Sequence, residues 1–255
     1  MRIKTPLLKH QVAAVEKLRK IKVGALFMEQ GTGKTRTTLE LIKRRLDAGK
    51  VDKVLWLSPC SVKKNLMNDI KKHIGEMPGV FTISGIESLS NSAKLYNQLM
   101  ELVKSYDCYL IVDESSLVKN IKAKRTQRII ELAERCKYKL ILNGTPITKT
   151  EADLFAQWYI LDWRILGYRS FHAFEANHIE YRSIRMPNGN ERIDKTRIRR
   201  ILNTDYLAEK IEPYTYQVKK KDCIRLPKKL YNYKSYELSV PQRYRYTKIK
   251  QEYLV

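Results

Sequence analysis

The sequence predicts an α/β fold with a central, mainly parallel sheet flanked by helices. Three observations predict it. Short apolar runs alternate with longer amphipathic stretches, a pattern typical of βαβ units. The chain of 255 residues is 43% hydrophobic, which is enough for one large domain or two small ones. A glycine-rich turn also stands between the first apolar run and the helix expected after it, as in α/β folds that bind ligands at strand ends.

The expected elements follow in order along the chain. Apolar residues from Leu7 to Ile21 recur at helical spacing and predict an amphipathic helix at the start. Strands are then expected at Val23–Met28, Lys53–Ser58, Val80–Ile83, Cys108–Val112 and Lys139–Leu142. Helices are expected between them, at Thr35–Leu46, Ser61–His73, Ala93–Lys104 and Lys124–Arg135. We also expect Phe171 and Phe174 to pack in the core, because they are spaced as on one helix face.

The stretch Gly31-Thr32-Gly33-Lys34-Thr35 predicts a phosphate-binding loop. Glycines permit a tight turn that aims backbone N–H groups at phosphate oxygens, and the following helix adds its positive N-terminal end. Lys34 would reach the β- and γ-phosphates, and the Thr35 hydroxyl would bind Mg²⁺. The full Walker A pattern is not met, since Met28 stands where the first glycine is expected.

Two adjacent carboxylates, Asp113 and Glu114, follow the apolar run Cys108–Val112. This is a Walker B arrangement, in which Asp113 would bind Mg²⁺ and Glu114 would orient and deprotonate an attacking water. Gln11 precedes the loop by about twenty residues, and its amide could pair with the edge of adenine. Each feature alone also fits a solvated loop or a surface glutamine, but together they indicate an ATP site.

Composition indicates the class of partner. The 50 Lys and Arg against 27 Asp and Glu give a net charge of +23, which points to a polyanion. No apolar run approaches the roughly 18 residues of a membrane span. Four isolated cysteines, without metal-ligand spacing, indicate reduced core residues of an intracellular protein. We expect it in the cytoplasm, with the nucleus as the alternative.

The order of the motifs resembles the helicase-like ATPases of superfamily two, and within them the SWI/SNF-type double-stranded-DNA translocases. Leu7 to Gln11 resembles the Q motif, and EQGTGKT resembles motif I, DEMGLGKT. LWLSPCSVKKN resembles motif Ia, DESSLVKN resembles DEAHxxKN, and LNGTPIT resembles motif III, LTGTPLQN. The LPKK stretch from Leu226 is similar to the segment leading into a second lobe.

This resemblance implies a RecA-like lobe over residues 1–180 and a basic, helical extension over residues 181–255. It implies ATP and Mg²⁺ as cofactors, with Gln11, Gly31, Thr32, Gly33, Lys34 and Thr35 holding the nucleotide. It implies sequence-independent binding of duplex DNA, with Ser58, Lys63 and Lys64 as backbone contacts. Ser116 and Thr145 would couple the ATP site to movement, although Ser116 departs from DEAH, and Thr148 and Lys149 depart from Gln-Asn.

The chain ends at Val255, about where the second RecA-like lobe of such motors begins. We therefore expect a second lobe in cis or trans and poor ATP hydrolysis by this chain alone, since that lobe supplies an arginine finger. The compact form favours a prokaryotic or viral member. A single-strand or RNA helicase and a non-catalytic basic DNA-binding module with a vestigial nucleotide site remain alternatives.

The last part of the chain is the most basic. Residues 181–255 hold 19 Lys and Arg against 8 Asp and Glu. The basic cluster Lys195–Arg200 lies here, after the turn expected at Met186–Glu191, and nine tyrosines lie between Tyr206 and Tyr253. Basic residues interleaved with aromatics can follow a phosphate backbone, and they fit equally well a solvated face beside a seam for the second lobe.

Overall fold

The computed structural model describes residues 1–147, 150–186, 191–223 and 230–253. They form two compact units, Met1–Ile224 and Arg225–Val255. The first unit is built on a six-stranded sheet in the order β3-β2-β4-β5-β1-β8, and all its strands are parallel. The strands are β1 Val23–Met28, β2 Lys53–Ser58, β3 Phe81–Gly85, β4 Cys108–Val112, β5 Tyr138–Asn143 and β8 Thr215–Val218. The predicted α/β class with a parallel sheet is confirmed.

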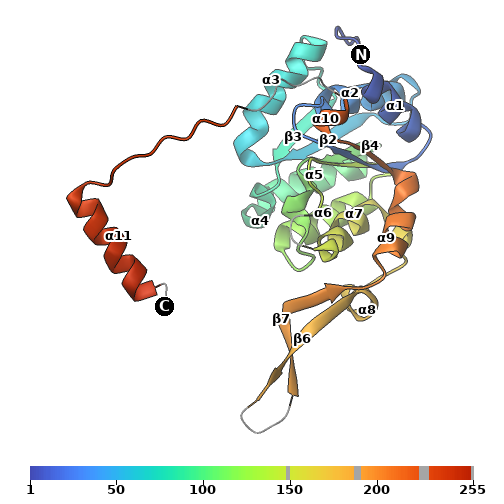
Figure 1. Ribbon diagram of the computed structural model, residues 1–255. Helices are drawn as coiled ribbons and strands as arrows, with labels where there is room; N and C mark the ends of the chain where they lie inside the picture. Colours follow the sequence, from blue (N-terminus) through green and yellow to red (C-terminus); the bar gives the residue numbers. More distant parts are fainter. Residues whose placement is uncertain (148–149, 187–190, 224–229, 254–255) are drawn as a thin grey trace. The chain divides into compact units, whose positions relative to one another are not determined.

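Helices cover both faces of this sheet (Figure 1). One face packs against α1 Lys9–Leu18, α2 Lys34–Asp47 and α3 Lys63–Ile74. The other packs against α4 Ser88–Asn91, α5 Ala93–Ser105, α6 Lys124–Glu134 and α7 Leu154–Leu166. Within β1, Leu26 and Met28 face the first group while Ala25 and Phe27 face the second, because successive strand residues point to opposite faces.

Short single turns connect several of these elements. They are the 3-10 segments η1 Cys60–Val62, η2 Ser115–Val118, η3 Glu151–Asp153 and η4 Glu212–Tyr214. Two of them, η1 and η2, directly follow the carboxyl ends of β2 and β4. They therefore lie at the edge of the sheet where ligands bind in folds of this class.

Beyond α7 the first unit contains elements that the sequence did not predict. Helix α8, Phe171–His178, places Phe174 fully in the core, and the half-buried Phe171 packs against that core, which confirms the predicted packing. An antiparallel ribbon follows, formed by β6 Ile179–Arg185 and β7 Glu191–Ile201. Then come α9 Thr204–Ile211, strand β8 and the short α10 Lys220–Cys223. Because β8 pairs with β1, the first unit extends past residue 180, where the sequence analysis placed the end of the lobe.

The second unit contains α11, Val240–Tyr253. Its described side chains are exposed, including Tyr231, Tyr233 and Tyr236 ahead of the helix and Tyr244 and Tyr246 within it. The LPKK stretch at Leu226 and the residues Thr148 and Lys149 lie outside the described residues.

The cysteines are free thiols in different environments. Cys108 and Cys136 are buried, as expected, whereas Cys60 is exposed and Cys223 is half-buried. The expectation of core positions for all four is therefore corrected for Cys60, which lies in η1 beyond the end of β2. No helix in the described part of the chain combines the length and the apolar character needed to cross a membrane.

Candidate nucleotide site

The loop between β1 and α2 has the geometry of an anion-binding turn. Gly31 and Gly33 both have φ of +85°, a backbone conformation that glycine adopts without strain. At Gly33 a Cβ atom would lie 2.2 Å from Nε2 of Gln11, so a side chain cannot be accommodated there without displacing Gln11. Within the described part of the chain, no protein acceptor is bonded to the N–H groups of Gly31, Gly33, Lys34 and Thr35. Unpaired donors at a helix N-terminus can donate hydrogen bonds to an anion such as phosphate.

Lys34 rests on the loop itself. Its Nζ donates to the carbonyl oxygen of Met28 at 3.0 Å and lies 4.0 Å from Oε1 of Glu114. Met28, which replaces the first Walker glycine, is a fully buried residue at the end of β1. The ammonium group is thus held by one neutral carbonyl at the mouth of the loop, close to where a phosphate would lie.

Asp113 and Glu114 come to the same edge of the sheet. Strand β5 lies between β1 and β4, so β1 and β4 are about 10 Å apart. The loops that follow these two strands therefore have room for phosphate groups between them. The peptide N–H of Glu114 donates to Oδ1 of Asp113 at 2.9 Å. Glu114 has φ of +48°, and among the described non-glycine residues it shares a positive φ only with Asn203. Such strain concentrates at functional sites.

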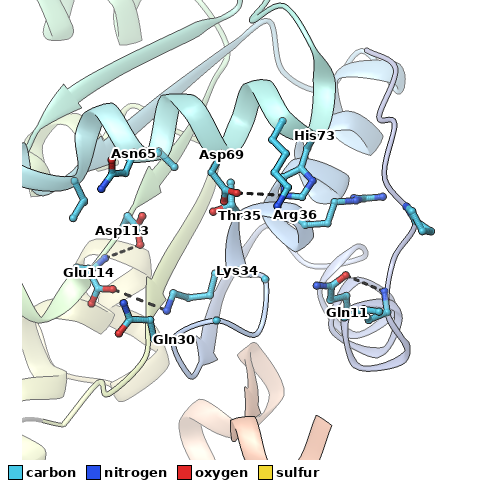
Figure 2. Close-up of a pocket in the computed structure, with 17 residues that line it drawn as sticks. Gln11, Gln30, Lys34, Thr35, Arg36, Asn65, Asp69, His73, Asp113 and Glu114 are labelled. Carbon is cyan, nitrogen blue, oxygen red and sulfur yellow. Dashed lines mark hydrogen bonds and ion pairs between the residues drawn. The ribbon is translucent and has the colours of Figure 1, made fainter. Parts of the chain in front are cut away.

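These groups line one pocket of about 650 Å³ (Figure 2), within the usual range for small-molecule sites. Figure 2 shows Lys34 pointing towards Glu114, and Asn65 and Asp69 of α3 lying along the side of the pocket. Of the predicted nucleotide-site residues, the lining includes Gln11, Gly31, Gly33, Lys34, Thr35, Asp113 and Glu114. Thr32 is buried, and its hydroxyl donates to the Glu29 carbonyl at 2.7 Å, so its side chain stabilises the loop.

Gln11 is also bonded to the loop. It is 4% exposed, its Oε1 accepts from the N–H of Leu8 at 2.9 Å, and its Nε2 donates to the carbonyl of Thr32 at 3.2 Å. Nε2 of His10 lies 2.8 Å from the same carbonyl. Gln11 therefore positions the phosphate loop in this structure, which is a contact that the adenine-pairing prediction did not include.

Comparison with known proteins identifies the family. A model of the SNF2-related domain matches residues 10–255. The chain belongs to the SNF2-related domain family. It is 26% identical over 114 residues to a SWI/SNF-related matrix-associated actin-dependent regulator of chromatin subfamily A-like protein 1 of Drosophila melanogaster, covering 39% of this chain and 15% of that protein. It is 30% identical over 108 residues to the SNF2 domain-containing protein ENL1 of Oryza sativa subsp. japonica, covering 42% and 10%.

The fold of this SNF2-related domain is shared with solved structures. The Sulfolobus solfataricus SWI2/SNF2 ATPase core in complex with dsDNA superimposes with a TM-score of 0.64 at 21% identity, covering 86% of this chain and 45% of that one. The Sulfolobus solfataricus SWI2/SNF2 ATPase core domain gives 0.64 at 20% identity over the same shares. The chain thus spans under half of these structures and 15% or less of the two curated relatives.

A buried polar network in this SNF2-related domain joins the loop after β4, which carries the two carboxylates, to the loop after β5. Ser115 Oγ donates to Gln157 Oε1 at 2.5 Å, and Gln157 Nε2 donates to the carbonyl of Pro146 at 2.9 Å. Asn143 Nδ2 donates to Ser115 Oγ at 3.4 Å, and Asn143 Oδ1 accepts from the N–H of Thr145 at 3.0 Å. The segment after β4 is therefore linked to the loop after β5 through α7.

The predicted coupling pair lies beside this network. Ser116 is half-buried, Thr145 is exposed, and no hydrogen bond between these two residues occurs in the described part of the chain. Ser115, Asn143 and Gln157 were not among the residues predicted from the sequence. Gln157 follows Ser115 by 42 residues, so no local spacing could connect them. The available signal was the presence of polar residues in or beside apolar runs, because a buried polar group needs a hydrogen-bond partner.

Glu29 makes a second unpredicted link. Its peptide N–H donates to the carbonyl of Val218 at 3.1 Å, and its carboxylate accepts from the N–H of Lys220 at 2.6 Å. A Cβ atom on Gly31 would lie 3.5 Å from Nζ of Lys220. Lys220 follows β8 and lies 191 positions beyond Glu29 in the sequence. The fold thus places this lysine beside the loop between β1 and α2.

The residues predicted to contact DNA differ in their exposure to solvent. Ser58 is fully buried, and the partner of its hydroxyl among the described residues is the Pro59 carbonyl, at 3.5 Å. Its predicted surface contact is therefore corrected, because a buried hydroxyl cannot reach a ligand in this conformation. Lys63 is half-buried and Lys64 is exposed at the start of α3, and both stay predictions.

Removing the charge of Asp113 should stabilise the nucleotide-free protein. Burial, then the charge of Glu114, raises the pKa of Asp113 to about 6. A raised carboxyl pKa means that stability is lost as pH rises from about 4 through 6, by at most about 3 kcal/mol for this shift. Asp113→Asn keeps an oxygen that can accept from Glu114. It should therefore raise the melting temperature at pH 7.5 by several degrees.

Thermal denaturation at pH 7.5 and at pH 4.5 checks this prediction, with the exposed Asp107→Asn as the control. The gain of the Asp113 variant should shrink at pH 4.5, because the wild-type carboxyl is then largely protonated. A variant that melts at or below the wild-type temperature at pH 7.5 would contradict the assigned environment.

Proposed function

We propose that this chain is the ATP-binding and ATP-hydrolysing lobe of a SWI/SNF-type double-stranded-DNA translocase. One observation carries the proposal: a loop with unpaired N–H donors, Lys34 and the Asp113–Glu114 pair all line one pocket. Positioning and charge stabilisation are the main catalytic requirements of phosphoryl transfer, and this set of groups can provide both.

Each residue has an assigned role in this proposal. The N–H groups of Gly31, Gly33, Lys34 and Thr35 bind the β- and γ-phosphates, and Lys34 turns from the Met28 carbonyl to a phosphate oxygen. Glu114 orients the attacking water and accepts its proton. Gln11 holds the loop and faces the adenine end of the pocket.

The same residues fit Mg²⁺. The ion usually takes one or two carboxylates together with substrate phosphates, and Asp113 with the Thr35 hydroxyl would hold it here. Asp113 forms no ion pair among the described residues, since Nζ of Lys34 approaches Glu114, not Asp113, at 4.0 Å. When bound, the ion would neutralise charge on the phosphates.

We further propose that a second RecA-like lobe, in cis or in trans, completes the motor, since this chain spans 45% of the two SWI2/SNF2 core structures. Arg36 is the one arginine among the described residues that line the pocket. Its guanidinium is committed to the Thr5 carbonyl at 2.9 Å and to Glu40 at 3.2 Å. An arginine finger is worth roughly 10³–10⁵ in rate, so this chain by itself should turn over slowly.

Steady-state ATP hydrolysis tests the proposal. The rate is measured for this chain and for the same chain joined to a second lobe, each with duplex DNA, single-stranded DNA or RNA. We expect slow turnover by this chain, and fast turnover stimulated most by duplex DNA in the joined form. Stimulation mainly by RNA or single strands would instead support a helicase. DNA binding without hydrolysis by either form would support a basic module with a vestigial site.

A further inference from the structure

The ribbon of β6 and β7 has an anchored half and an unsupported half. Near its base Ile179 is 7% exposed, and Tyr181, Ile198 and Ile201 pack against the core of the first unit. Further out, every described residue of the two strands from Ser183 to Arg185 and from Glu191 to Ile193 is exposed. Figure 1 shows β6 and β7 extending away from the sheet and its helices.

Both faces of the outer half carry an arginine and an isoleucine, and the face of Arg185 also carries Ser183 and Glu191. The register pairs Ile184 with Arg192, and Ser183 with Ile193. Directly opposite residues share a face and successive residues alternate, so each face presents an arginine and an isoleucine. Ile184 is 45% exposed and Ile193 is 63% exposed. A two-stranded ribbon with neither face covered is marginally stable in water, which favours a partner that encloses it.

The charge of the ribbon is unevenly neutralised. Residues 179–201 hold seven Arg and Lys against three Asp and Glu. Four of the basic residues form ion pairs: Arg199 and Arg200 with Glu180, Lys195 with Glu175, and Arg197 with Asp194. In the described part of the chain, Arg182, Arg185 and Arg192 form no ion pair. These three arginines are exposed; Arg185 and Arg192 lie on the unsupported half, and Arg182 lies directly next to it.

We propose that this ribbon is a duplex-DNA-binding arm that enters a groove, with Arg182, Arg185 and Arg192 contacting phosphates. The inference rests on the proposed function, and it adds a DNA contact distinct from the predicted one at α3. The major groove admits a two-stranded ribbon, and arm-like binders place arginines and apolar side chains such as isoleucine in the minor groove. A groove has two walls, which matches a ribbon with an arginine on each face.

An anionic membrane would also attract these arginines. A flat lipid surface, however, would be met by one face of the ribbon and would leave the other arginine and isoleucine in water. The symmetry of the two faces therefore favours DNA over a membrane. Vesicle binding enters the test as an outcome that overturns the proposal.

The test measures binding of the whole 255-residue chain to a fluorescently labelled duplex of 20 base pairs, by anisotropy, between 50 and 200 mM salt. The ribbon variant is Arg182→Ala with Arg185→Ala and Arg192→Ala. The control variant removes the same charge elsewhere, with Lys20→Ala, Lys50→Ala and Lys94→Ala, all exposed and in no ion pair within the described part of the chain. A charge-preserving variant replaces the same three arginines by lysine.

We expect the ribbon variant to lose at least about tenfold in affinity at 100 mM salt. The slope of log K against log salt concentration should fall by about 2 to 3, since each phosphate contact contributes about 0.9. The control variant should change affinity by less than about twofold, and the lysine variant should retain most of the binding. Binding of a fluorescent ATP analogue, expected to be unchanged in all variants, shows that the lobe is folded.

The outcomes separate this inference from the proposed function. If the wild-type chain does not bind duplex DNA, both the arm and the DNA-dependent function fall. If it binds and the ribbon variant matches the control, the arm falls and the function stands. If the ribbon variant keeps its DNA affinity and loses binding to vesicles of anionic phospholipid, the ribbon is a membrane contact and the proposal is overturned.

Discussion

Lys34→Ala is expected to reduce ATP affinity by at least about 100-fold. A hydrogen bond to a charged group contributes about 1.5–3 kcal/mol, and a phosphate-bound lysine makes more than one such contact with a highly charged ligand. The lobe should stay folded, because the partners of Nζ in this structure are the Met28 carbonyl at 3.0 Å and Glu114 at 4.0 Å. Calorimetric titration with Mg²⁺ and a non-hydrolysable ATP analogue measures the change.

Lys43→Ala is the matched control, since Lys43 lies on the same helix and forms an exposed ion pair with Asp47. That variant removes the same charge away from the loop and should bind the analogue as the wild type does. Equal affinities for the Lys34 variant and the wild type would overturn the assignment of the phosphate loop.

Glu114→Gln is expected to lower the rate of ATP hydrolysis by about 10² to 10⁴, the usual contribution of a general base. The affinity for ATP should change little. Glu114 is negatively charged, so it does not itself attract the phosphates, and it lies 4.0 Å from Nζ of Lys34. Glutamine has the same length and can adopt the same φ of +48° with no greater strain than glutamate. Single-turnover hydrolysis separates this loss from product release.

The control for this variant is Glu101→Gln on α5, whose side chain is 74% exposed. It should hydrolyse ATP at the wild-type rate. If Glu114→Gln also does so, then Glu114 is not the base, and the strained backbone at this residue has another cause.

Some elements could be predicted from the sequence because burial leaves a strong signal. Val23–Met28 and Cys108–Val112 are strands over the predicted ranges, since a parallel strand covered on both faces is a continuous apolar run. Strand β8 was missed because it is an edge strand that pairs with β1 alone and its side chains are largely half-buried. The outer ribbon was missed because neither of its faces is packed, so it has no alternation to detect.

The candidate site likewise contains residues that could be predicted from the sequence and residues that could not. The loop, Lys34, Asp113 and Glu114 could be predicted because each directly follows an apolar strand, and parallel strands end at one edge of the sheet. Ser58 also ends a strand, but its side chain points into the protein, and position at a strand end does not fix that direction. The bonds from Glu29 to Lys220 and from Ser115 to Gln157 join residues distant in sequence, so the fold had to be known first.

The most direct test of the central claim is the position of the nucleotide. A crystal structure of this chain with Mg²⁺ and a non-hydrolysable ATP analogue would provide it. We expect the β- and γ-phosphates to accept hydrogen bonds from the N–H groups of Gly31, Gly33, Lys34 and Thr35. We also expect Nζ of Lys34 to move from the Met28 carbonyl to a phosphate oxygen and the ion to lie beside Asp113. Phosphates bound elsewhere, or a pocket that excludes the analogue at saturating concentration, would contradict it.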